Sequence, residues 1–255
     1  MSNTPTRHQA ERVRQEPKRR TLTVTAVHDI TPRMRRIELT SPELADFASR
    51  APDDHIKLFL PDPTEPSGEA MRDYTPRRFD AERRLLTLDF ALHEAGPATR
   101  WAQTAVPGDR LAIGGPKGSV IVPDDFDWYL LVGDETALPA IGRRIESLRP
   151  GVPVTSVVIV ESADDIQHFD TAARHEPVWV LRSGRTGEDA ALLHEALARW
   201  RTPEGEGYAW IAAEAQVARA VKAYMLEERA HPKAWLKASG YWIRGAAGAT
   251  DKMEG

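Results

Sequence analysis

Two patterns of hydrophobic and polar residues divide the chain near residue 126. Before it, short stretches rich in β-branched residues alternate between apolar and polar positions, with Pro- and Gly-containing turns between them. Such alternation is typical of half-buried β-strands. We predict strands over 21–27, 33–40, 55–60, 72–79 and 85–92, and two short ones within 110–122. A series of short strands with turn signals favours a small antiparallel barrel over residues 18–125.

After residue 126, continuous apolar stretches alternate with helical patterns. The stretches 128–132, 154–160, 178–181 and 208–212 are predicted strands, and apolar residues at helical spacing predict helices after Gly133, over 188–200 and over 214–229. Apolar strands alternating with helices indicate a parallel sheet covered on both faces. Ligands of such sheets bind at the carboxyl ends of the strands. We assign residues 126–230 to this second domain.

The two ends of the chain follow neither pattern. Residues 1–17 are polar and rich in arginine, which predicts a mobile or loosely docked basic arm; a nucleic-acid-binding arm is the alternative. Residues 231–255 form an aromatic and basic tail that is too short for a domain. Its aromatic side chains need a surface to pack on, either a cofactor cleft or the open side of the barrel.

The stretch from Arg72 to Arg77 is the first candidate binding site. In a strand, Arg72, Tyr74 and Pro76 lie on one face. An aromatic ring can pack on a flat heterocycle, and a guanidinium can bind a phosphate through two donors. This pattern indicates a cofactor with an aromatic head and a phosphate tail. The alternative is a charged edge strand with a structural tyrosine.

A second candidate begins at Gly96-Pro97, where proline at the first helical position predicts a helix start. Small residues fill its first turn, and a bare helix N-terminus binds phosphate. The alternative is a simple connecting helix. Gly133–Ala140 gives weaker evidence: it lacks the G-x-G-x-x-G pattern but keeps the strand–glycine–turn–helix context of nucleotide-binding turns.

Composition narrows the chemistry. The 255 residues include no cysteine, which excludes disulfides, thiolate nucleophiles and cysteine-bound metals. Redox chemistry would therefore use an organic cofactor or a metal held by other ligands. The net charge of −4 gives no general attraction to nucleic acid or anionic membranes. No apolar run approaches the ~20 residues that span a bilayer, and no secretory signal is visible. We expect a soluble, cytoplasmic monomer.

Taken in order, the motifs resemble the siderophore-interacting protein family of flavin-dependent ferric-siderophore reductases, a branch of the ferredoxin–NADP reductase-like superfamily. The resemblance runs from about Pro17 to Gly245. Its matching stretches are Thr31–Arg36, His55–Leu58, Arg72–Arg77, His93 with Gly96–Ala98, Trp101-Ala102, Gly133–Ile141 and Gly240–Trp242 with Arg244. One departure is Ala213-Glu214, where similar proteins often have a Gly-Glu pair.

The resemblance implies a six-stranded antiparallel FAD-binding barrel followed by a parallel-sheet nicotinamide-binding-type domain. It assigns the isoalloxazine and phosphates to Arg72, Tyr74, Thr75 and Arg77. It assigns the pyrophosphate and adenine side to His93, Gly96, Ala98 and Thr99. The other cofactor-binding residues that we expect are Asp89, Trp101, Asp134, Thr136 and Trp242.

The implied activity is FAD-dependent reduction of a ferric siderophore to release Fe(II). We expect Lys57, Arg100 and Arg244 to attract anionic iron complexes. Arg182 and Arg185 follow the strand 178–181 and would bind the 2′-phosphate of NADPH, since no acidic residue lies between Val178 and Gly187. NADH or a ferredoxin is the alternative donor. The alternative functions are a flavin reductase with another acceptor and a non-catalytic siderophore-binding module.

Overall fold

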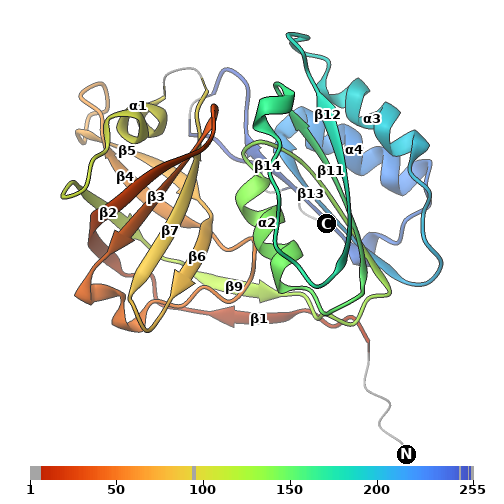
Figure 1. The fold of residues 1–255 in the computed structure, drawn as a ribbon, viewed down its shortest axis with the longest axis horizontal. Coiled ribbons are helices and arrows are strands. Elements are labelled where there is room, and N and C mark those ends of the chain that lie inside the picture. The colour runs from red at the N-terminus through yellow and green to blue at the C-terminus, as the bar shows by residue number, and fades with distance from the viewer. Residues whose placement is uncertain (1–6, 94–95, 247, 252, 254–255) are drawn as a thin grey trace, which may run out of the picture.

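The computed structural model describes residues 7–93, 96–246, 248–251 and 253. A curled antiparallel sheet lies beside a parallel sheet that carries helices on both faces (Figure 1). The predicted fold class is therefore confirmed. Among the described helices, none is long and apolar enough to cross a bilayer.

The curled sheet has seven strands in the order β5-β4-β8-β2-β3-β7-β6. They are β2 (Arg19–Thr31), β3 (Met34–Thr40), β4 (Ile56–Pro61), β5 (Glu69–Tyr74), β6 (Pro76–Asp80), β7 (Leu85–Ala91) and β8 (Arg110–Gly114). The short helix η1 (Pro42–Asp46) follows β3, and α1 (Pro97–Thr104) follows β7. Inward-facing side chains such as Leu58, Leu88 and Phe90 form one apolar core.

A single residue joins the two edge strands of this sheet, so the sheet has to curl. β5 ends at Tyr74 and β6 begins at Pro76, yet the two strands lie at opposite edges. Only Thr75, which is buried, lies between them. Proline has no N–H to donate to a ladder, which favours a break in strand pairing here. The strand predicted over 72–79 is thus bent into two, and a barrel predicted with six strands has seven.

The parallel sheet has five strands in the order β12-β11-β10-β13-β14. They are β10 (Trp128–Asp134), β11 (Pro153–Val160), β12 (Arg174–Leu181), β13 (Gly207–Glu214) and β14 (Leu236–Trp242). The first four were predicted. The fifth belongs to the tail: it does not close the barrel but pairs in parallel with β13. A short strand at a sheet edge is hard to recognise from sequence, because its residue preferences depend on how its side chains pack against the neighbouring strand.

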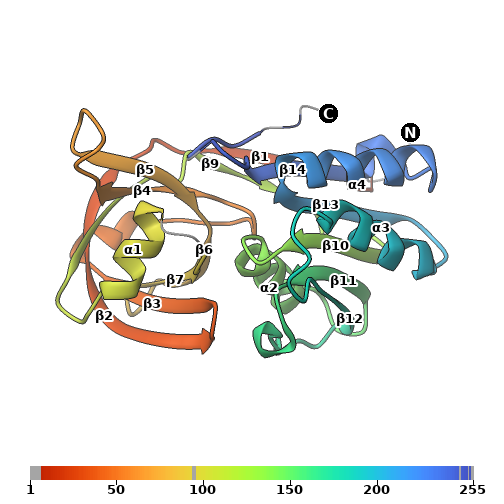
Figure 2. The same ribbon diagram turned by 90° about the horizontal axis from the view of Figure 1, so that it is seen from above.

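The helices divide between the two faces of the parallel sheet. α2 (Leu138–Ser147) covers the face toward the barrel, and α3 (Asp189–Arg199) and α4 (Ala215–Glu227) cover the other face (Figure 2). The short helices η2 (Ala163–Asp165) and η3 (Lys233–Trp235) lie in the connections after β11 and before β14. Strands β10, β11 and β13 are buried almost throughout, as the apolar stretches predicted.

The N-terminal segment is docked from residue 7 onward. β1 (Glu11–Arg14) pairs antiparallel with β9 (Gly118–Ile121) in a two-stranded ribbon that runs below both parts of the molecule (Figure 1). We expected a mobile or loosely docked arm here, and expected β9 in the barrel. Both expectations are wrong for these residues; residues 1–6 of the arm lie outside the described part. Gly118 permits the pairing, because its φ is +147° and a Cβ there would lie 2.2 Å from the Val13 carbonyl oxygen.

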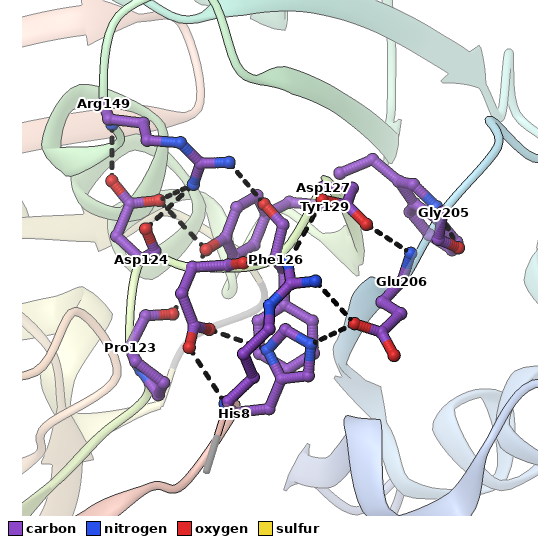
Figure 3. Close-up of polar contacts among 12 residues, drawn as sticks. His8, Pro123, Asp124, Phe126, Asp127, Tyr129, Arg149, Gly205 and Glu206 are labelled. Carbon is purple, nitrogen blue, oxygen red and sulfur yellow. Dashed lines mark hydrogen bonds and ion pairs between the residues drawn. The ribbon is translucent and has the colours of Figure 1, made fainter. Parts of the chain in front are cut away.

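His8 anchors this segment to the connection between the two parts (Figure 3). Its imidazole stacks on the Phe126 ring at 3.7 Å and an interplanar angle of 12°. Its Nδ1 lies 2.7 Å from Asp125 Oδ1, and its Nε2 lies 3.0 Å from Glu206 Oε2. Burial acts to raise the pKa of Asp125, but hydrogen bonds from His8 hold that pKa below its usual value. The imidazole therefore links the N-terminal segment both to Asp125, in the connection between the two parts, and to Glu206, just before β13.

We expect the His8→Ala variant to lose about 2 kcal/mol of unfolding free energy, because a stacked ring pair and charge-assisted contacts are removed together. Urea denaturation at neutral pH measures this. The control is His28→Ala, which removes an exposed imidazole and should change the unfolding free energy by less than about 0.5 kcal/mol. Equal effects of the two substitutions would contradict the anchoring role.

Candidate functional site

Arg72 and Tyr74 share the inner face of β5, as predicted. Leu58 and Ile56, their partners across the β4–β5 ladder, both belong to the barrel core. The Tyr74 ring packs on the Phe90 ring with centroids 4.6 Å apart. The Phe90 ring also packs on Trp101 of α1, with centroids 5.6 Å apart. Burial raises the pKa of Tyr74, so its phenol stays neutral. The ring is thus a fixed, uncharged surface on which a flat heterocycle can pack.

The Arg72 guanidinium lies close to this ring and is available to an anion. Its hydrogen bond goes to the carbonyl of its own neighbour, Met71, at 2.9 Å. Among the described residues, no carboxylate is within ion-pair distance of it. The C-terminal segment passes nearby, since a Cβ on Gly248 would lie 2.8 Å from Arg72 Nη1. Within the described part of the chain, Arg72 therefore has no carboxylate in direct contact, and Asp62 is affected by its charge only from beyond ion-pair distance.

The N-terminus of α1 supplies the second half of a phosphate site. Its N-cap, Gly96, makes no side-chain cap bond, and no acidic residue lies in the first turn. A Cβ on Gly96 would meet no atom of the described residues within 4 Å, so a ligand has room to approach. Ala98 and Thr99 are buried behind this end, and His93 is exposed on the connection leading to it. These features fit the phosphates of FAD, because free N–H groups and the positive helix end favour anions.

Arg77 and Asp89 have different surroundings from those that we predicted. Arg77 donates to both oxygens of Glu146, at 2.7 and 2.5 Å, and its Nε lies 3.6 Å from Asp89. Asp89 in turn accepts two hydrogen bonds from Arg36, at 2.7 and 2.8 Å. Both predicted cofactor ligands are thus engaged in ion pairs within the protein. A phosphate beside Arg77 would face two carboxylates, which argues against the predicted role.

Asp134, Thr136 and Trp242 were predicted separately, and the structure brings them together at the carboxyl end of β10. Asp134 is buried; its Oδ1 accepts from the Thr136 N–H and hydroxyl at 2.9 and 2.5 Å. Its Oδ2 accepts from the Glu214 N–H and the Trp242 indole, both at 2.9 Å. One carboxylate therefore fixes the ends of β10, β13 and β14. This is the edge at which ligands of parallel sheets bind.

Arg182 and Arg185, predicted to bind NADPH, differ in their environment. Arg182 is buried, and it donates to Asp189 at 2.9–3.0 Å and to Glu135 at 2.8 and 3.1 Å. Burial opposes its charge, but these hydrogen bonds raise the pKa of Arg182 above its ordinary value. Arg185 is exposed, and within the described part of the chain it donates only to the carbonyls of Leu181 and Arg182, at 3.0 and 3.1 Å. The geometry thus favours Arg185 over Arg182 as a phosphate ligand.

The three basic residues predicted for the iron complex do not form one cluster of unpaired charges. Lys57 donates to Asp73 at 2.8 Å, and both lie on the outer face of the β4–β5 ladder, opposite Arg72 and Tyr74. Arg100 lies 3.6 Å from an Asp62 oxygen. Arg244 is exposed, with its guanidinium 5.9 Å from the Trp242 ring centroid. Of the three, Arg244 lies nearest the Asp134 cluster, because its N–H donates to Glu214.

A separate open groove of about 640 Å³ runs along β12 and α3. Its apolar wall includes Val178, Leu192 and Trp200, and Arg185 lies at one end. Among the described residues that line it, Arg185 alone was predicted as a site residue. The groove therefore does not mark the position of the flavin, and the site rests on Tyr74, Arg72 and α1 instead.

Asp53 was not predicted as a site residue. It lies in the connection before β4, and its Oδ2 accepts from Lys237 Nζ at 2.5 Å and from the Trp210 indole at 3.1 Å. Burial acts to raise the pKa of Asp53, but the Lys237 ammonium keeps it below its usual value. Tyr241, on the same strand as Lys237, packs edge-on against Trp210 at 6.0 Å. No local pattern signals this contact, since its partners are about 160 to 180 residues away along the chain.

Comparisons with known protein families agree with this architecture. The family described as siderophore-interacting protein matches residues 126–245, and the siderophore-interacting FAD-binding domain matches residues 23–70 and 62–120. The NADPH-dependent ferric-chelate reductase of Escherichia coli (strain K12) is 34% identical over 261 residues, which cover 95% of this chain and 99% of the relative. The ferric vibriobactin reductase ViuB of Vibrio cholerae is 26% identical, with 82% and 84% covered.

Solved structures give the same result. A siderophore utilization protein from T. fusca superposes with a TM-score of 0.89 at 36% identity, covering 96% of this chain and 100% of that one. A ferredoxin NADP+ reductase from Neisseria gonorrhoeae superposes with a TM-score of 0.56 at 16% identity, covering 82% and 91%, and shows likeness of fold alone. From its matched regions and its relatives, this chain belongs to the siderophore-interacting protein family.

Proposed function

We propose that this protein reduces ferric siderophores with a bound FAD, takes its electrons from NADPH, and so releases iron as Fe(II). The observation that carries the proposal is the position of the Tyr74 ring beside two groups that can bind phosphate. These groups are the Arg72 guanidinium and the bare N-terminus of α1. The Escherichia coli relative is named as an NADPH-dependent ferric-chelate reductase, which supports both the donor and the reaction. The Vibrio relative, a ferric vibriobactin reductase, supports a siderophore as the substrate.

FAD held by Tyr74, Arg72 and α1 would supply the redox chemistry that links a two-electron nicotinamide donor to a one-electron iron acceptor. Siderophore oxygens hold the hard Fe(III) ion tightly and hold Fe(II) far less tightly, so electron transfer alone releases the metal. The protein then needs no acid or base at the iron. Tyr74 provides the surface for the isoalloxazine, Arg72 and α1 hold the phosphates, and Asp134 orders the edge of the sheet where the nucleotide approaches.

The acceptor side is part of the proposal. We assign Lys57, Arg100 and Arg244 to the attraction of anionic ferric complexes; Arg100 and Arg244 are exposed to an incoming substrate. Lys57 would act from its ion pair with Asp73, which reduces its net field. We also propose that the protein acts as a cytoplasmic monomer, and a reduced ferredoxin is the alternative electron donor.

Absorption spectra and anaerobic mixing test the function. Purified protein is expected to be yellow, to bleach on addition of NADPH, and to regain its colour on addition of a ferric siderophore while a chromogenic chelator captures Fe(II). A colourless protein that still binds the ferric siderophore would indicate a binding module instead. A flavin that NADPH bleaches but that ferric siderophores reoxidise no faster than buffer would indicate another acceptor.

A further inference from the structure

Helix α2 binds the barrel at the residues that directly follow the bend between β5 and β6. Arg77 of β6 forms a two-point ion pair with Glu146 of α2, at 2.7 and 2.5 Å. Arg143, also on α2, donates to the carbonyls of Pro76 at 3.0 Å and Ser49 at 2.6 Å. The Arg77 side chain is 9% exposed and the Glu146 side chain 33%, so water screens this pair only in part.

Gly142 lets the helix approach this closely. A Cβ at Gly142 would lie 3.2 Å from Arg77 Nη2 and 2.5 Å from a ring carbon of Phe169. No side chain fits there without displacing a neighbour. The backbone of α2 therefore lies close to the Arg77 guanidinium at Gly142.

The two ends of α2 serve different parts of the candidate site. Its N-terminus follows the turn that contains Asp134 and Thr136, at the nucleotide edge of the sheet. Its other half contacts Pro76-Arg77, which only Thr75 separates from Tyr74. A helix of 10 residues is about 15 Å long and stiff. The contact at Arg77 thus sets the distance between the flavin surface and the nucleotide edge.

We propose that Arg77, Arg143 and Glu146 form a clamp that positions the nicotinamide-binding domain against the flavin. Arg77 is then a positioning residue and not a phosphate ligand, because Glu146 and Asp89 already flank its guanidinium. This inference rests on the proposed function. Misplacing reactants by about 1 Å can slow a reaction about a hundredfold, so a loosened clamp should reduce the rate of flavin reduction and not the binding of FAD.

The Glu146→Gln variant keeps the shape of the side chain and removes its charge. We expect the apoprotein to bind FAD with a dissociation constant within about twofold of the wild type, while reduction by saturating NADPH slows about tenfold. Reduction by dithionite, which needs no nucleotide site, should be unchanged. The matched control is Glu195→Gln, an exposed carboxylate on α3 that should change none of the three measurements.

Arg77→Ala, alone and combined with Glu146→Gln, completes a double-mutant cycle. The clamp predicts that the double variant is reduced no more slowly than the slower single variant, since both remove one interaction. If Glu146→Gln is reduced by NADPH at the wild-type rate, the clamp does not position the domain. If Arg77→Ala loses FAD as strongly as Arg72→Ala, Arg77 is a phosphate ligand after all. A wild-type protein that binds no FAD would instead overturn the proposed function, and this inference with it.

Discussion

The Arg72→Ala variant is expected to purify as folded, largely colourless protein, with FAD bound about 30- to 100-fold more weakly than in the wild type. A charge-assisted phosphate contact contributes about 2–3 kcal/mol, and each 1.4 kcal/mol is about a tenfold change in affinity. The fold should persist, because among the described residues the Arg72 side chain hydrogen-bonds only to the Met71 carbonyl and pairs with no carboxylate. Flavin fluorescence titration of the apoprotein measures the effect.

The matched control for this experiment is Arg78→Ala. Arg78 lies on β6 and is exposed, so its loss should leave FAD binding unchanged. The two variants together separate a specific phosphate contact from a general loss of positive charge. Stoichiometric FAD in purified Arg72→Ala protein would show that the phosphates are held elsewhere.

Replacing Arg182 and Arg185 one at a time is expected to give the second large effect, on stability in one variant and on NADPH use in the other. Arg182→Ala leaves the carboxylates of Glu135 and Asp189 without their cation in a buried site, which costs about 3–5 kcal/mol of unfolding free energy. Arg185→Ala should leave stability unchanged and raise the KM for NADPH about tenfold, with NADH unaffected, since only a contact to the 2′-phosphate is lost. Urea denaturation and stopped-flow reduction by each nucleotide measure the two effects.

Two other outcomes would contradict the assignment of Arg185 as the residue that selects NADPH. If Arg182→Ala keeps the wild-type stability but loses the preference for NADPH, Arg182 is the phosphate ligand that the sequence predicted. If the wild type is reduced equally slowly by both nucleotides and rapidly by a reduced ferredoxin, neither arginine selects the donor. Lys222→Ala on α4 is a control for the loss of a distant cation from the same domain.

Much of the fold follows from local pattern. Alternating strands before residue 126, apolar strands with helices after it, and the Gly96-Pro97 helix start were all recognisable, because burial on one face of an element imposes a period on the sequence. The shared face of Arg72 and Tyr74 follows from the same period. The elements missed are short and have little periodicity: they include β1, β14 and the helices η1, η2 and η3. The bend at Thr75 was also missed.

The sequence by itself thus determined the fold class, most of the strands and helices, and the Arg72–Tyr74 face. Only the tertiary structure decided which charges remain available to a ligand. No acidic residue lies between Val178 and Gly187, yet Arg182 is paired with Glu135 from the turn after β10 and with Asp189 at the start of α3. Arg77 looks like Arg72 in sequence, yet it is held by Glu146. Periodicity arises from neighbours along the chain, whereas the partner of a buried charge is set by packing between distant elements, and no local pattern encodes it.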